Sequence, residues 1–412
     1  GGASSFWGNQ IALSPSPLCC ARFAWAFVPP SMAAVGLAGP PPARLPALLA
    51  VPLWVYLGAP AADLLAGEDT RNPPLGADAA PPPAPRRSSD RRQGGAARRA
   101  AFLAVPAGYA GAYVGLFWWG LGAVARGLPP PRLALLTAAI GVLGGLAINA
   151  AHELLHSRER WCNALSGAVL AHVAYQHWQE SHRVHHLHVA MRGDPSSARL
   201  HEPFARFLPR SVGGNVRDAL ASPAAGPARK ALWLAGPTLV AALAWRAAGP
   251  AGLAFWAGQA ALSVFQLELV NYIEHYGLRR EDDGGPPRPE HSWDCAFPIT
   301  GATLLHVTRH ADHHAHSARR YQDLQLSPQA PRMPLPYPAL MLVALFLPPL
   351  FYRMMDHVVD REEAQRPGDG HRAGRRRGAE TGRHAERQDA GQGAEHQLQH
   401  QDPQDPQATQ HT

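Results

Sequence analysis

Apolar blocks, each close to the length that crosses a lipid bilayer, are the feature that most limits how this chain of 412 residues can fold. A spanning helix needs about 20 consecutive apolar residues. Prolines interrupt some blocks, which a helix bundle tolerates because neighbouring helices satisfy the freed backbone groups. We therefore predict an all-α, six-span transmembrane helical bundle. The predicted spans are residues 21–39, 43–65, 101–125, 132–151, 231–248 and 251–273.

The composition of the chain divides it into three regions. Residues 1–20 give no functional signal. Residues 21–355 are predicted to form one membrane-embedded domain, in which the proline-interrupted stretch 335–352 is interfacial rather than spanning. Residues 356–412 are rich in Gly, Gln, Arg, His and Asp. They are predicted to be a disordered tail, because they carry too little apolar surface to form a core.

Arginine is concentrated in the polar connector between the second and third predicted spans, residues 66–100. The positive-inside rule places such a loop in the cytoplasm. A nucleic-acid-binding patch is the alternative, but the connector lacks interleaved aromatic residues, so no nucleic-acid partner is expected. When the spans are counted from this loop, every histidine cluster described below lies on the same, cytoplasmic side.

Histidine clusters follow the predicted spans at helical spacing. Residues at i, i+3 and i+4 share one face of a helix. Clustered imidazoles fill a core poorly and resist joint protonation, so packing does not explain them. They predict one metal site built from several helices. The clusters are His152 and His156, then His182, His185 and His186, and then His310, His313 and His314.

The number of histidines limits the identity of the metal. His152-Glu-Leu-Leu-His156 is a HExxH motif, which in zinc proteases supplies two ligands and a general base, here Glu153. Such a zinc site needs only one further ligand, whereas this chain offers many more. So many neutral imidazoles favour iron and suit a site with two ions. Nearby carboxylates are either solvated charges or partners that orient the rings. They are Glu153, Asp194, Glu274 and Asp312.

The cysteines limit where electrons can come from. The sequence has four cysteines and no CxxC pair, so it encodes neither a disulfide framework nor a rubredoxin-type iron module. It also carries no flavin or haem motif. A metal site reached through apolar helices implies a substrate dissolved in lipid, and iron, dioxygen and such a substrate indicate C–H oxidation. The two electrons must then come from another protein.

The order of the motifs resembles the integral-membrane, AlkB-type alkane monooxygenases, which are relatives of the membrane fatty-acid desaturases. The stretch Asn271-Tyr-Ile-Glu-His275-Tyr-Gly277 is the most discriminating, because it separates that family from desaturases. The resemblance covers about residues 21–355. The matching stretches are residues 63–74, 149–156, 185–195, 271–278 and 309–316.

The resemblance implies nine ligands for two iron ions. One of them is assigned against the usual pattern of the family, Glu-His-x-x-Gly-His-His, because this chain has Ser181 where that histidine is expected. His182 stands one residue closer and gives the HxxHH spacing of desaturases and xylene-type monooxygenases, which still shares one helical face. The implied ligands are His152, His156, His182, His185, His186, His275, His310, His313 and His314.

The resemblance also implies an activity and partners. The chain is expected to hydroxylate the terminal C–H of medium- or long-chain alkanes in the bacterial inner membrane. Its electrons are expected from rubredoxin and an NADH-dependent rubredoxin reductase. The alternatives are a xylene-type or fatty-acyl hydroxylase or desaturase on the same scaffold and, less favoured, a membrane zinc protease that uses only the HExxH motif.

A stripe of small side chains on the second predicted span is a candidate wall for a substrate channel. Val51, Val55, Gly58 and Ala62 stand at i, i+4, i+7 and i+11, on one face of a regular helix. Val55 and Gly58 are the candidate channel residues. Close helix–helix packing is the alternative, because small residues are common where membrane helices meet.

Overall fold

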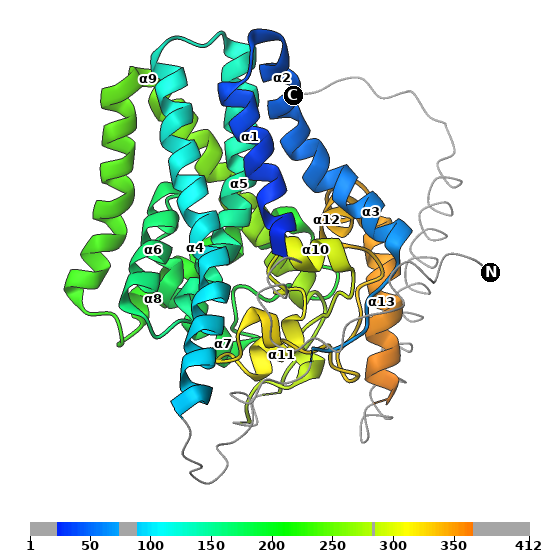
Figure 1. Ribbon diagram of the computed structural model, residues 1–412. Helices are drawn as coiled ribbons and strands as arrows, with labels where there is room; N and C mark the ends of the chain where they lie inside the picture. The colour runs from blue at the N-terminus through cyan, green and yellow to red at the C-terminus, as the bar shows by residue number, and fades with distance from the viewer. Residues whose placement is uncertain (1–22, 74–88, 282–284, 366–412) are drawn as a thin grey trace, which may run out of the picture. The chain divides into compact units, whose positions relative to one another are not determined.

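The computed structural model describes residues 23–73, 89–281 and 285–365 (Figure 1). These residues fold into helices and loops, with extended pairing only at two isolated bridges that both involve Asp294. The predicted all-α membrane bundle is therefore confirmed. The segment 1–20 and most of the predicted tail lie outside the described residues. At the tail, α13 (Pro348–Gln365) runs beyond the predicted domain end at residue 355.

Four described helical segments are long and apolar enough to cross a membrane: Arg44–Ala66, Arg99–Ala125, Pro130–Leu155 and Pro227–His275. The last, α9, has 49 residues and leaves the helical conformation at Ala248 and Gly249. Gly249 has a φ of 56°, which glycine adopts without strain. This break is where the fifth and sixth spans were predicted to meet. The first predicted span is a shorter apolar helix, Phe23–Ala38, so the six-span count stays a prediction.

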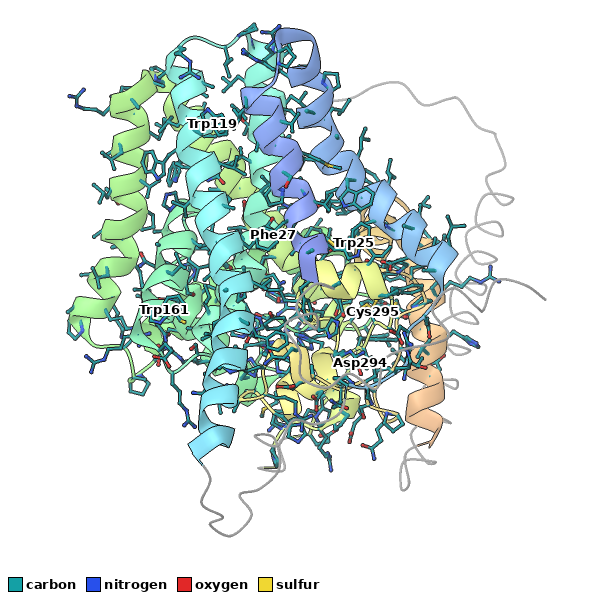
Figure 2. All side chains as sticks on the ribbon, in the orientation of Figure 1. Trp25, Phe27, Trp119, Trp161, Asp294 and Cys295 are labelled. Carbon is teal, nitrogen blue, oxygen red and sulfur yellow. The ribbon has the colours of Figure 1, made fainter. Side chains whose placement is uncertain are left out.

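Exposed apolar side chains on the outer helices agree with a membrane environment. On α2 (Pro41–Leu53) they include Leu45 and Leu49, and on α9 they include Leu234 and Leu239. Monomeric soluble proteins rarely expose apolar surface so continuously. Trp119 on α4 (Ser89–Ala125) and Trp161 on α6 (Arg160–His172) are exposed as well, and both are labelled in Figure 2.

The helix α4 begins earlier than the predicted third span. It starts at Ser89, so the last part of the polar connector is helical although it is not apolar. The sequence Ser89-Asp-Arg-Arg-Gln-Gly-Gly-Ala-Ala-Arg-Arg contains several good helix formers, which explains why the helix continues beyond the apolar block.

Close packing of α5 (Pro130–Leu155) against α9 positions the site. Gly144 of α5 faces Ser263 of α9, and a Cβ added at Gly144 would lie 2.1 Å from the serine oxygen. Ser263 Oγ and Gln266 Nε2 both donate to the carbonyl of Gly141, at 3.0 and 2.9 Å. Small residues let membrane helices approach, and hydrogen bonds between them add to the association. The C-terminal ends of α5 and α9 are thereby held in register.

A π-helical turn, Trp54–Gly58, interrupts the second predicted span between α2 and α3 (Ala59–Ala66). Pro52 and Pro60 flank this turn, and neither can donate a backbone hydrogen bond to the helical ladder. The turn inserts one residue into the helix, so the buried face changes register. The predicted stripe continuing through Gly58 and Ala62 is therefore wrong. Val51, Val55, Ala59 and Asp63 are buried, whereas Gly58 and Ala62 are only half-buried.

Shorter elements gather at the end of the bundle where α5 and α9 end (Figure 1). They carry most of the histidine clusters and the loops around them. They are α7 (Trp178–His188), α8 (Phe204–Ala221), α10 (Pro298–Thr303), α11 (His310–Ala315), the 3-10 turns Pro289–His291 and Tyr321–Asp323, and α12 (Tyr337–Phe346).

Candidate metal centre

The nine histidines predicted as ligands come together from four helices. α5 and α9 bring histidines at their C-terminal ends, where their apolar sequence stops. α7 and α11 bring three each, at the i, i+3 and i+4 spacing that shares a face. They form one group of five, His152, His156, His182, His186 and His313, and one group of four, His185, His275, His310 and His314.

The Nε2 atoms of the group of five form a closed ring. Within the group the nitrogens lie within 4.8 Å of one another. Two ligands that bind one metal at about 2.1 Å and at right angles are about 3.0 Å apart, so this spacing suits one ion. The Nε2 separations are 2.9 Å for His152–His313, 3.1 Å for His313–His186, 2.9 Å for His186–His182, 3.3 Å for His182–His156 and 3.2 Å for His156–His152.

Hydrogen bonding alone cannot satisfy this ring. Each contact needs one N–H and one bare nitrogen, and a neutral imidazole nitrogen offers one or the other. Donors and acceptors would have to alternate around the ring, which five atoms cannot do. A cation that accepts every lone pair resolves the conflict, so the donor set fits a metal ion.

Burial keeps these imidazoles in the form that binds metal. Burial and then the neighbouring histidines lower the pKa of His182, His186 and His313 well below the usual value. Burial lowers the pKa of His156 to about 4. Metal ligands must be deprotonated, so the site is neutral and ready for a cation near pH 7.

The group of four adjoins the first group. His310 Nε2 lies 3.1 Å from His275 Nε2 and 3.0 Å from His314 Nε2. The rings of His314 and His186, from different groups, are 4.4 Å apart between centroids. Burial lowers the pKa of His310 and His314 well below the usual value. The arrangement therefore offers two adjacent sets of neutral nitrogen donors.

Asp194 occupies the place expected of an orienting carboxylate. Its Oδ2 lies 2.9 Å from His185 Nδ1, which leaves Nε2 of this histidine for the group of four. Ser197 Oγ donates to the same oxygen at 2.6 Å. Burial alone would raise the pKa of Asp194, but His185 and Ser197 bring it below the usual value. A carboxylate in this position fixes both the tautomer and the orientation of a ligating imidazole.

The other three predicted carboxylates behave differently from one another. Glu274 Oε2 lies 3.3 Å from His310 Nε2, so it faces the donor nitrogens themselves. Glu153 accepts a hydrogen bond from the backbone N–H of Tyr321. Asp312 accepts from His316 Nδ1 at 2.8 Å and from Arg319 and the Gln325 amide.

The predicted ring-orienting role is therefore wrong for Glu153 and Asp312. Among the described residues, neither carboxylate bonds to any of the nine histidines. Asp312 shares α11 with three of them, but its i+4 neighbour His316 turns it toward the loop that follows the helix.

An apolar cavity leads to both groups of histidines. It encloses about 770 Å³, its open mouth included, within the range of pockets that hold small ligands. Val55 lies in its wall, whereas Gly58 does not, because the π-helical turn directs it toward Trp54. Its lining includes the apolar residues Leu146, Leu267, Val270 and Met341 and, from the two groups, His152, His182, His185 and His310.

Two cavity features were missed by the sequence reasoning. Trp178 lines the cavity and stacks on His182, with ring centroids 4.3 Å apart; its i, i+4 spacing was a usable signal. Tyr56 donates to Gln266 Oε1 at 2.6 Å across the cavity wall, and these residues lie too far apart in sequence for any spacing rule.

The structure also separates neighbouring candidates in the histidine clusters. His182, and not Ser181, contributes to the group of five. The histidines that fitted no ligand spacing lie outside both groups. They are His172, His177, His188, His291, His306 and His316.

Comparison with known proteins agrees with the helical metal site. Residues 128–338 match the family model described as Fatty acid desaturase. The chain is 36% identical over 231 residues to a protein named alkane 1-monooxygenase 2 of Pseudomonas aeruginosa. It is 32% identical over 324 residues to the alkane 1-monooxygenase of Pseudomonas putida. A shorter match, 30% identical over 89 residues, is to a xylene/toluene monooxygenase hydroxylase component of Pseudomonas putida.

These matches differ in how much of each protein they cover. The match to the Pseudomonas aeruginosa protein covers 52% of this chain but 61% of that relative, so the chain spans about three fifths of its length. The Pseudomonas putida alkane 1-monooxygenase is matched over 75% of this chain and 77% of its own length. The xylene/toluene protein is matched over 22% of this chain and 23% of its length.

Proposed function

This chain belongs to the alkane 1-monooxygenases, within the wider fatty acid desaturase family, and we propose that it hydroxylates the terminal carbon of medium- or long-chain alkanes. The reaction inserts one oxygen atom of O₂ into a C–H bond and releases the other as water. Two electrons and two protons are consumed for each alkane converted to an alcohol.

The observation that carries this proposal is the apolar cavity that ends on both histidine groups. Most of its lining surface is apolar and so suits an alkane, and His152, His182, His185 and His310 line the same cavity. A terminal carbon that enters the cavity is therefore brought to the histidine groups rather than to a surface. The buried setting also keeps water from the reacting carbon.

Two iron ions are the cofactors we propose, one for each histidine group. When bound, they supply the activation of dioxygen. The group of five offers His152, His156, His182, His186 and His313, and the group of four offers His185, His275, His310 and His314. Glu274 Oε2 lies beside His310 Nε2 and is close enough to join the second set. Asp194 orients His185 through its hydrogen bond.

The electrons are proposed to come from rubredoxin, itself reduced by an NADH-dependent reductase. The chain has four cysteines without a CxxC pair, so it needs an external donor. We place the protein in the bacterial inner membrane with both histidine groups on the cytoplasmic side. Reporters fused after Arg92 and after Asp323 should both give a cytoplasmic signal, and a periplasmic signal from either would contradict this topology.

The experiment that tests the activity uses membranes that contain the full chain, rubredoxin and its reductase. They are incubated with NADH and a panel of alkanes, xylenes and fatty-acyl lipids, and the products are identified by mass spectrometry. Terminal alcohols from the alkanes support the proposal. Products from xylenes or acyl lipids alone would move the assignment to the alternatives on the same scaffold.

An inactive variant serves as the control that the product forms at the histidine centre. His186→Ala removes a nitrogen that contacts both His182 and His313 in the group of five. It should abolish product formation while the protein still inserts into the membrane. A variant that kept full activity would show that the observed product does not arise at this centre.

A further inference from the structure

The segment 68–73, which follows α3, belongs to one of the stretches that sequence analysis singled out, yet the proposed function does not use it. We call it the strap. It begins with a backbone hydrogen bond from the Asp69 N–H to the carbonyl of Ala296, at 2.9 Å. The strap also contacts the chain on both sides of α11, at Arg309 and at Leu326, although more than 200 residues separate it from them in the sequence.

The helix α11 needs such support. It has six residues, fewer than two turns, and helices this short are not stable alone. It nevertheless carries His313 for the group of five and two histidines for the group of four. A shift of α11 would therefore change both groups at once. At its N-terminal end, the Ala311 N–H donates to Asp294 Oδ1 at 2.9 Å; Asp294 is labelled in Figure 2.

Arg309, the residue before His310, fastens α11 to the strap. Its guanidinium is buried and donates to Asn72 Oδ1 at 3.1 Å and to the carbonyls of Arg71 and Leu324, at 3.0 and 2.8 Å. A buried charge is costly unless its hydrogen bonds are made, so these acceptors determine where the guanidinium lies.

Asn72 also fastens the loop on the other side of α11. Its Oδ1 accepts from the Leu326 N–H at 2.7 Å, and its Nδ2 donates to the Leu326 carbonyl at 3.0 Å. The neighbouring Gln325 N–H donates to Asp312 of α11 at 2.9 Å, and Gln325 Nε2 donates to the Pro73 carbonyl at 3.1 Å. One amide side chain therefore joins both ends of α11 to the strap.

We propose that Asn72 is a positioning residue for the candidate metal centre. It touches none of the nine histidines and acts through Arg309 and the loop at Leu326, which together set the position of α11. This role rests on the proposed binding of metal by the histidines. It does not depend on which substrate the centre oxidises.

The test compares Asn72→Ala with Arg71→Ala in the purified full chain, loaded with Co²⁺, whose visible absorption reports the geometry of its ligands. The Arg71 side chain is 73% exposed and, among the described residues, pairs only with Asp69 on the strap, while its carbonyl, which bonds Arg309, survives the substitution. Asn72→Ala should change the Co²⁺ absorption. In the iron-loaded chain it should lower kcat for alkane hydroxylation about tenfold, the low end for groups that orient ligands, with KM for the alkane little changed. Arg71→Ala should match wild type in both.

Conservative variants keep the proposal open to refutation if Asn72→Ala does not fold. Asn72→Asp retains acceptors for Arg309 and the Leu326 N–H and should keep most of the wild-type absorption. Asn72→Gln keeps the amide on a longer stem and should shift the absorption in the direction of the alanine variant. A Co²⁺ spectrum identical to that of the wild type would overturn the proposal, whether it comes from Asn72→Ala or, if that variant does not fold, from Asn72→Gln.

The same measurement separates this inference from the proposed function. A wild-type chain that binds Co²⁺ but hydroxylates no alkane would refute the proposed substrate and leave the role of Asn72 to be judged by its spectrum. A wild-type chain that binds no Co²⁺ would overturn the metal centre and the role of Asn72 together.

Discussion

Two kinds of helix supply the histidines, and they hold them in place by different means. α5 and α9, with 26 and 49 residues, carry His152 and His275 near their ends and are fixed by close packing along their length, to which hydrogen bonds between the two helices add. α11 has six residues and is held by a hydrogen bond that Asp294 accepts from the Ala311 N–H and by hydrogen bonds that the adjacent Arg309 donates. Ligands on long helices are thus positioned by the bundle, whereas those on α11 depend on polar side chains scattered along the chain.

The largest effects are expected from removing one histidine of each kind. His275→Ala takes a donor from α9 and the group of four, and His313→Ala takes one from α11 and the group of five. Each should lower the iron content and reduce hydroxylation more than about 100-fold, beyond the effect of losing an orienting partner. Iron analysis and product formation on membrane-inserted protein check this. Iron content equal to wild type would remove that histidine from the site.

Substitutions of two carboxylates beside the histidines, Asp194 and Asp312, should have different effects, one on metal binding and the other on stability. Asp194→Asn weakens the hydrogen bond that orients His185 and should lower metal affinity about 10- to 100-fold. Asp312→Asn leaves Arg319 without its carboxylate partner and should cost about 3 kcal/mol of stability, because the pair is largely buried. Metal titration and thermal unfolding of the two variants measure these effects. Asp194→Asn should be the more damaging variant for metal affinity, and Asp312→Asn the more damaging one for stability. If one variant were the more damaging in both measurements, the two carboxylates would not differ in role.

The sequence was informative where the cause is local and failed where it is not. The i, i+3 and i+4 spacing brought His182, His185 and His186 to one helical face, and the apolar blocks with Gly249 between them marked the bend in α9. Asp312 was predicted to orient one of the ligating histidines, because it stands among them on α11. It binds His316 instead, and it accepts a hydrogen bond from the Gln325 N–H in a later loop. Asn72 meets Arg309 only after folding, and no local pattern reveals that contact.

The cavity wall on the second predicted span gives a smaller, selective effect. Val55 lines the cavity, so Val55→Trp should fill it and shift the preference toward shorter alkanes by about tenfold in relative rate. Gly58 lies outside the cavity, and a Cβ there would meet the Trp54 ring at 2.7 Å, so Gly58→Ala should depress all chain lengths alike. Relative rates on a graded alkane series decide. An equal loss of rate for all chain lengths in Val55→Trp would contradict the assignment of Val55 to the channel wall.

The smallest effect is expected at Ser181, beside a residue where the effect is large. Ser181 is buried, but its hydroxyl has no partner among the described residues, so Ser181→Ala should change activity less than about twofold. His182→Ala should behave like His185→Ala and abolish activity, because His182 Nε2 lies within 3.3 Å of both His156 and His186. The reverse pattern would mean that this cluster is aligned one residue out of register.

The metal content of the purified wild-type chain tests the central claim most directly. Two adjacent groups, with five and four histidine nitrogens, are proposed to hold one iron each. Elemental analysis of protein loaded under reducing conditions should find close to two iron atoms per chain. One zinc per chain and no iron would contradict the account and favour a hydrolytic site built on His152 and His156.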